Sequence, residues 1–107
     1  MLVLLDENLP QKLRFLITGH DVRTAGFQGW AGLSNGALLK AAEEAGFDVV
    51  VTADQGIRYQ QNRKSSNLAL IVLSTNDRTL VTTHTAGILA SISAARPGSL
   101  VFLDIGY

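Results

Sequence analysis

The chain has 107 residues, 47% hydrophobic and 17% charged, and this composition predicts one folded domain rather than a disordered segment. It contains no cysteine, which excludes disulfides, thiolate zinc sites and a cysteine nucleophile and favours a reducing, cytoplasmic location. Nine basic residues balance nine acidic ones, so any contact with nucleic acid must be local. No membrane-spanning segment or signal peptide is predicted, because polar residues interrupt the apolar runs.

The first part of the chain alternates short apolar runs with a segment of helical spacing. Leu2–Leu5 is apolar at every position, as in a strand that is covered on both faces. Pro10 fits the first turn of a helix that ends at Gly19. His20–Thr24 then predicts a second short strand.

The middle of the chain repeats this pattern. A glycine-punctuated loop, residues 26–32, precedes a helix that Ser34 or Asn35 caps and Gly46 ends. The next run, Val49–Thr52, is again apolar up to its last residue and predicts a third strand that is buried on both faces.

The last part of the chain adds a strand over Leu68–Leu73, a weaker helix over Thr79–Ala95 and a strand over Leu100–Leu103. Helical crossovers between successive strands imply a largely parallel sheet. We therefore expect a single domain over residues 1–107, of three-layer α/β/α architecture. Its mainly parallel five-stranded sheet is expected in the order 2-1-3-4-5.

Two aspartates follow neighbouring strands of this predicted sheet. Asp6 comes directly after the first strand, and Asp54 follows the third. Neighbouring strands lie about 4.8 Å apart, so both carboxylates can reach one cation at the carboxyl edge. Each aspartate alone is equally consistent with capping the next helix. Glu7 is expected either as a further ligand or as a solvated or capping residue.

Several segments together resemble a known family. They are Leu4–Pro10 (L-L-D-E-N-L-P), Gly19–Val22 (G-H-D-V), Gly32–Asn35 (G-L-S-N), Val49–Asp54 (V-V-V-T-A-D) and the closing strand. Here the sequence resembles the PIN-like domains, in particular a small family whose members begin with D-E-N-L-P. The resemblance covers most of the chain, and its most specific part is D-E-N-L-P followed by V-x-T-x-D at this spacing.

PIN-like domains are metal-dependent ribonucleases, and many are toxins of bacterial toxin–antitoxin pairs. The resemblance implies an Mg²⁺- or Mn²⁺-dependent endoribonuclease, with Asp6 and Asp54 as direct ligands and Glu7 and Asn35 completing or positioning the shell. The bound ion would lower the pKa of a water molecule and stabilise charge on the phosphoryl oxygens. RNA, a cognate antitoxin protein and a second copy of the chain are the expected partners.

The chain departs from the family pattern in two places. Asn35 stands where the family usually has an acid, so metal affinity is expected to fall. Residues 55–58 (Q-G-I-R) replace the acid and aromatic residue that usually follow the V-x-T-x-D segment. Arg58, Arg63 and Lys64 are expected either to hold a flanking phosphate or to form a solvated polar face.

Two other functions stay open on the sequence. One is a non-catalytic PIN-like binding module, which the Asn35 substitution favours. The other is a receiver domain with Asp54 as phosphoacceptor, although residues 103–107 (L-D-I-G-Y) lack the lysine that such domains need. Trp30 is interpreted either as an aromatic that stacks on a base or contacts a partner, or as part of the core.

Overall fold

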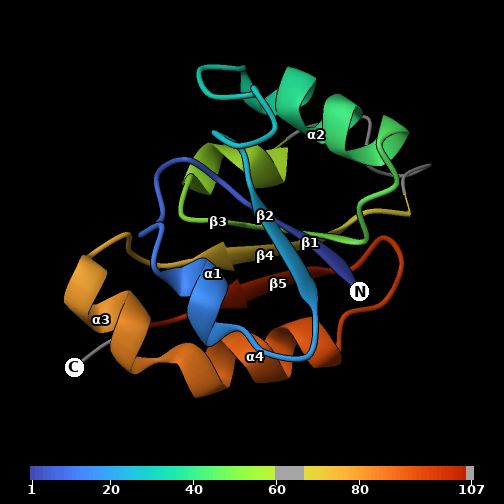
Figure 1. Ribbon diagram of the computed structural model, residues 1–107. Coiled ribbons are helices and arrows are strands. Elements are labelled where there is room, and N and C mark those ends of the chain that lie inside the picture. The colour runs from blue at the N-terminus through green and yellow to red at the C-terminus, as the bar shows by residue number, and fades with distance from the viewer. Residues whose placement is uncertain (60–66, 106–107) are drawn as a thin grey trace.

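A computed structural model describes residues 1–59 and 67–105, with Arg58 and Tyr59 described by their backbone only. Its five strands form one sheet in the order β2-β1-β3-β4-β5, and all neighbouring pairs are parallel (Figure 1). The predicted sheet order is therefore confirmed. The strands are β1 (Leu2–Leu5), β2 (Asp21–Thr24), β3 (Val49–Thr52), β4 (Ala69–Leu73) and β5 (Leu100–Leu103).

Helices cover both faces of this sheet, which confirms the three-layer architecture. In Figure 1, α2 and η1 lie on one face, and α1, α3 and α4 lie on the other. None of the helices in the described ranges is long and apolar enough to cross a membrane. The helices are α1 (Leu13–Leu16), α2 (Asn35–Glu44), the 3₁₀ helix η1 (Gln55–Tyr59), α3 (Arg78–Thr83) and α4 (Thr85–Ser93).

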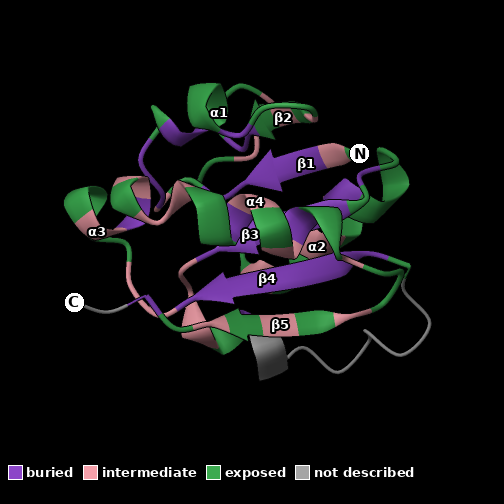
Figure 2. Cartoon of the chain, turned by 90° about the horizontal axis from the view of Figure 1, so that it is seen from below, coloured by how far each residue is buried: buried purple, intermediate pink, exposed green. Residues whose placement is uncertain are grey.

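The continuous apolar runs are explained by this double cover. Successive strand residues point to opposite faces, so a strand between two helical layers needs apolar residues at every position. Figure 2 shows β1, β3 and β4 as almost entirely buried, whereas β5 alternates between exposed and half-buried residues. The face toward α1, α3 and α4 contains Val3, Leu5, Leu13, Val49, Val51, Ile71, Val81, Ile88 and Ile92. The other contains Leu4, Leu38, Ala42, Val50, Ile57, Leu70 and Val72.

The helix expected over Thr79–Ala95 is two helices that meet at His84, so that prediction was wrong. Threonine hydroxyls compete for the carbonyls of this segment. Thr83 Oγ1 donates to Leu80 O at 3.0 Å and Thr85 Oγ1 donates to Thr82 O at 2.7 Å. His84 Nδ1 also donates to Leu80 O, at 2.8 Å. Such local bonds offer the backbone an alternative to the regular helix, and the chain bends here.

The first helix is also shorter than expected. Pro10 lies outside it, in a turn that the bond from Leu13 N–H to Pro10 O closes at 3.1 Å. The helix over Asn35–Glu44 begins as predicted, since the Ser34 hydroxyl accepts from Ala37 N–H at 3.3 Å. This places the start of α2 at the carboxyl edge of the sheet, beside the predicted site.

Candidate functional site

Asp6 lies where β1 ends, between β2 and β3 in the sheet. Its N–H continues the β1–β3 ladder by donating to Val51 O at 2.9 Å. The residue is only 7% exposed, and both carboxylate oxygens accept hydrogen bonds. Oδ1 accepts from Glu7 N–H at 2.8 Å, and Oδ2 accepts from the Thr52 hydroxyl at 2.6 Å. The carboxylate is therefore held in one orientation by the turn after β1 and by the end of β3.

Thr52 connects the two predicted aspartates. Its side chain is fully buried, and while its hydroxyl donates to Asp6 it accepts from Asp54 N–H at 3.0 Å. A hydroxyl has one proton and two lone pairs, so this residue both orients Asp6 and fixes the backbone that carries Asp54. Thr52 is not among the site residues predicted from the sequence. Its position could have indicated a role, because it is the one polar residue in an otherwise apolar strand and it ends that strand.

Asp54 and Asn35 border the same small space. Asp54 Oδ1 accepts from Gly56 N–H at 2.9 Å, which begins η1. A Cβ atom on Gly56 would lie 3.2 Å from Asp54 Oδ1 and 3.6 Å from Asn35 Nδ2. The structure therefore brings the start of α2 next to the carboxylate after β3. The role of Asn35 in completing the site, which the family resemblance implies, stays a prediction.

Glu7 is directed elsewhere. Its Oε1 accepts from Gly32 N–H at 2.9 Å, in the loop before α2. Across residues 1–59 and 67–105, no group of three or more histidine, aspartate or glutamate side chains is arranged to hold a metal ion. If this edge binds a metal, the protein ligands would be Asp6, Asp54 and the Asn35 amide. Such oxygen donors are of the kind that Mg²⁺ uses, since it is commonly bound through one or two carboxylates and keeps several waters.

Gln55 is one of the four residues, 55–58, that stand where the family resemblance leads us to expect an acid and an aromatic residue, and it has a structural role. Its Nε2 donates to Leu73 O at 2.7 Å and to Ala53 O at 3.3 Å. The side chain thereby joins the ends of β3 and β4. An amide can donate these bonds and an ionised carboxylate cannot, so the substitution stabilises the edge instead of adding charge to it.

Two further predictions concern the basic residues expected to contact phosphate and the aromatic residue Trp30. The side chain of Arg58, and the whole of Arg63 and Lys64, lie outside the described residues, so the predicted phosphate contact remains a prediction. Trp30 packs edge-on against Phe47, with ring centroids 5.7 Å apart. It is half-buried and packs against the core on the α2 face, which fits an aromatic at the edge of the core.

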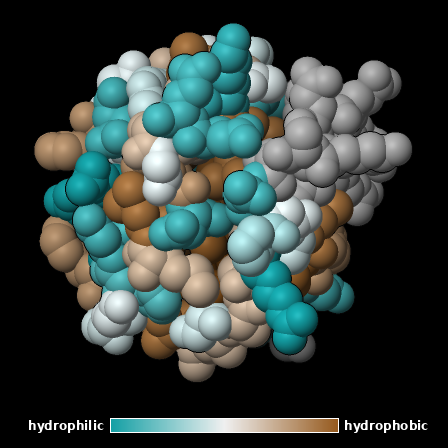
Figure 3. Space-filling model, turned by 90° about the vertical axis from the view of Figure 1, so that its right-hand side faces the viewer, coloured by the Kyte–Doolittle hydropathy of each residue, from teal (hydrophilic) through white to brown (hydrophobic). Residues whose placement is uncertain are grey.

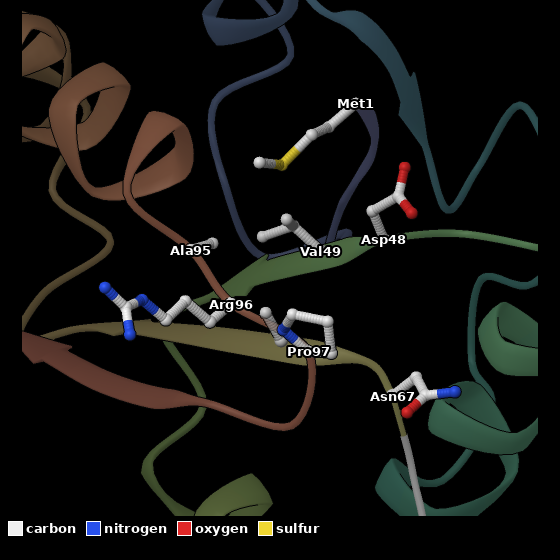
Figure 4. Close-up of a pocket in the computed structure, with 8 residues that line it drawn as sticks. Met1, Asp48, Val49, Asn67, Ala95, Arg96 and Pro97 are labelled. Atoms are coloured by element: carbon white, nitrogen blue, oxygen red, sulfur yellow. The ribbon is translucent and has the colours of Figure 1, made fainter.

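A pocket opens at the opposite, amino edge of the sheet. It encloses about 180 Å³ and contains none of the predicted site residues. In Figure 4, Asp48 and Val49 lie at the start of β3, and Arg96 and Pro97 follow α4. Figure 3 shows this side of the molecule, where apolar patches lie among hydrophilic side chains. Ligands of open parallel sheets bind at the carboxyl ends of the strands, so we assign the functional site to the edge with Asp6.

The fold and this site define a doubly wound α/β domain with two linked aspartates at the point where the strand order reverses. Protein-family models match no part of the chain, and no similar protein is found among the curated proteins or the solved structures. The family of the chain therefore remains a proposal, which the sequence motifs and the site geometry support.

Proposed function

We propose that this protein is a cytoplasmic, metal-dependent endoribonuclease of PIN-like type and the toxin of a toxin–antitoxin pair. The observation that carries the proposal is the Thr52 hydroxyl, which joins Asp6 and the Asp54 backbone at the switch point of the sheet. Two carboxylates at one edge repel each other at neutral pH, and a divalent cation relieves that repulsion. The resemblance at D-E-N-L-P and V-x-T-x-D supplies the reaction class.

Asp6 and Asp54 would hold Mg²⁺ or Mn²⁺, with the Asn35 amide beside them. Such an ion supplies a water of lowered pKa and stabilises charge on a phosphoryl oxygen. Asp6 contributes a carboxylate that two hydrogen bonds already orient. Asp54 Oδ1 accepts from Gly56 N–H, and Oδ2 receives no hydrogen bond from the described residues. Preorganised groups need little rearrangement during the reaction, which favours catalysis.

A binding module without catalysis is the second candidate, and specific observations favour it. Asn35 brings no negative charge, and Glu7 bonds Gly32 rather than the neighbouring aspartates. Such a domain would retain RNA binding and lose cleavage. The two candidates therefore differ in turnover and not in the RNA partner.

The experiment compares purified wild type with Asp6→Asn and Asp54→Asn, and uses Asp48→Asn at the opposite edge as a matched control. We expect Mn²⁺-dependent cleavage of a mixed RNA pool by the wild type and by Asp48→Asn. Both active-site variants should lose it while circular dichroism shows them folded. If the wild type binds RNA without cleaving it, the binding module is supported. If calorimetry shows that the wild type binds neither RNA nor metal, both candidate functions are excluded.

The receiver alternative gains no support from the end of β4. Ser74 could contact a phosphoryl group there, but its hydroxyl donates to Ile105 O at 3.0 Å and accepts from Ile105 N–H at 2.7 Å. We therefore expect acetyl phosphate to leave Asp54 unmodified, as intact-mass measurement can verify.

The toxin assignment has its own test. Induced expression of the wild type is expected to slow growth, and Asp54→Asn is expected to have no effect. If a short reading frame next to the gene encodes an antitoxin, its co-expression should restore growth. Equal growth with wild type and variant contradicts the toxin role but leaves the nuclease proposal to the cleavage assay.

A further inference from the structure

The loop between β2 and α2 carries the most exposed large apolar side chain of the described residues. Phe27 is 76% exposed, and its ring makes no aromatic or cation–π contact within those residues. Phe15 is also strongly exposed, at 68%, but the Arg14 guanidinium lies 4.4 Å from the centre of its ring. Phe27 therefore presents a free aromatic face.

The backbone on both sides of Phe27 is fixed. Phe27 N–H donates to the Thr24 hydroxyl at 3.2 Å, and Gln28 N–H donates to Thr24 O at 3.1 Å. Further along, Trp30 N–H donates to Ala25 O at 2.9 Å, and the half-buried Trp30 ring packs against the core. Binding of a ligand to Phe27 therefore costs little conformational entropy of the loop.

This loop is attached to the segment that carries the candidate site. Ala25 N–H donates to Leu5 O at 2.9 Å, and Gly32 N–H donates to Glu7 Oε1 at 2.9 Å. These two bonds span Asp6 and place the loop at the same edge of the sheet. An elongated ligand that reaches Asp6 and Asp54 can extend over this loop.

We propose that Phe27 stacks on a nucleobase of single-stranded RNA that lies across the Asp6–Asp54 edge; this inference rests on the proposed function. The edge itself is acidic and the chain has no net positive charge, so general attraction of phosphates contributes little affinity. Stacking on an aromatic ring needs no charge and accepts any base, since every base has a π-face.

The surroundings of Phe27 favour a base over a protein partner. Its sequence neighbours Gly26, Gln28 and Gly29 add little apolar area, and Leu33, 41% exposed, is the other exposed large apolar side chain of this loop. A stable protein interface needs about 1,000 Å² of well-packed surface. One isolated ring is enough for one base. The loop thus matches a strand of unpaired nucleotides better than a folded partner.

The test measures binding of a short fluorescein-labelled single-stranded RNA of mixed sequence by anisotropy in EDTA, where metal-dependent cleavage is absent. The proteins are wild type, Phe27→Ala, Phe27→Trp and the control Phe15→Ala. We expect Phe27→Ala to bind about tenfold more weakly. Phe27→Trp should keep its affinity, and RNA should quench its fluorescence more than that of the wild type, whose one tryptophan is Trp30. Phe15→Ala should bind like the wild type.

Equal dissociation constants for wild type and Phe27→Ala overturn the inference. So does a Phe27→Ala variant that binds RNA normally but dissociates a dimer in sedimentation, because Phe27 is then a protein contact. Cleavage in Mn²⁺ separates this inference from the proposed function. A wild type that binds RNA through Phe27 but never cleaves it refutes the nuclease and supports the stacking role. A wild type that cleaves RNA, with an equally active and tightly binding Phe27→Ala, refutes the stacking role alone.

Discussion

Both ends of the β1–β3 strand pair are joined by an aspartate, and the two aspartates differ in their surroundings. At the amino end, Asp48 Oδ2 accepts from Leu2 N–H at 2.8 Å, and the residue is exposed. At the carboxyl end, Asp6 Oδ2 accepts from the Thr52 hydroxyl at 2.6 Å, and the residue is 7% exposed. The strands are therefore tied at one end by a solvated carboxylate and at the other by a buried one.

Comparison of Asp48 with Asp6 shows that a carboxylate need not be buried to join β1 and β3. Asp48 joins the two strands while its charge stays in water. Removing a carboxylate from water is unfavourable unless hydrogen bonds or a cation compensate. In Asp6 the Glu7 N–H and the Thr52 hydroxyl supply this compensation, and the proposed cation would add to it.

The largest expected effect is on metal affinity at the two ends. Asp6→Asn removes a proposed ligand charge and should weaken Mn²⁺ binding by more than about 100-fold, beyond the loss that follows from removing an outer-shell partner. Asp48→Asn keeps an oxygen acceptor for Leu2 N–H and should leave Mn²⁺ affinity unchanged. Isothermal titration with MnCl₂ measures both. Equal affinities in the two variants would contradict the assignment of function to one end.

The next largest effect should come from the hydroxyl that joins the aspartates. Thr52→Val keeps the shape of the side chain but removes the donor to Asp6 Oδ2 and the acceptor for Asp54 N–H. We expect a loss of about 1–3 kcal/mol in the free energy of unfolding and Mn²⁺ binding about tenfold weaker. Urea denaturation and calorimetry are the measurements. Thr52→Ser retains the hydroxyl and should recover metal binding; a Val variant with wild-type affinity would show that the link is dispensable.

Restoring a carboxylate at the start of α2 should have the opposite sign. Asn35→Asp places a charge beside Asp54 and near a helix N-terminus, which favours negative groups. We expect Mn²⁺ to bind about tenfold more tightly, since ligand charge raises cation affinity. Asn67→Asp adds the same charge at the amino edge and should change nothing. Tighter binding in both variants would point to overall charge as the cause.

The smallest effect is expected at Gly56. Gly56→Ala adds a Cβ atom 3.2 Å from Asp54 Oδ1, closer than an ordinary van der Waals contact. The carboxylate must shift, and Mn²⁺ affinity should fall by a few-fold. Gly26→Ala is the matched control, because its Cβ would meet nothing within 4 Å. Similar calorimetric titrations of wild type and Gly56→Ala would show that the Asp54 carboxylate tolerates displacement.

The sheet could be predicted from the sequence because its central strands are apolar at every position. That pattern needs cover on both faces, and parallel order with helical crossovers follows from it. Asp6 and Asp54 could be placed at one edge for the same reason. Their surroundings could not, because a glutamate next to an aspartate gives no hint that its carboxylate bonds Gly32, 25 positions away in the sequence.

The exposure of the aromatic residues in the loop before α2 could not be predicted from the sequence either. Trp30 and Phe27 lie three positions apart in a loop without periodicity, and nothing local indicates which of them turns inward. The structure places Trp30 against Phe47, which the tertiary fold alone brings near. The break at His84 was missed for a related reason: the apolar spacing continues through it, while side-chain bonds to the backbone decide where the helix ends.

The order of the strands has a consequence for synthesis of the chain. The proposed ligands Asp6, Asn35 and Asp54 are synthesised before the last two helices. Yet Val3 and Val51, which flank the site, belong to the same core cluster as Val81, Ile88 and Ile92 of those helices. Without α3 and α4, this face of β1 and β3 loses part of its apolar cover. The nascent chain should therefore remain without a fully formed site until these helices have been synthesised.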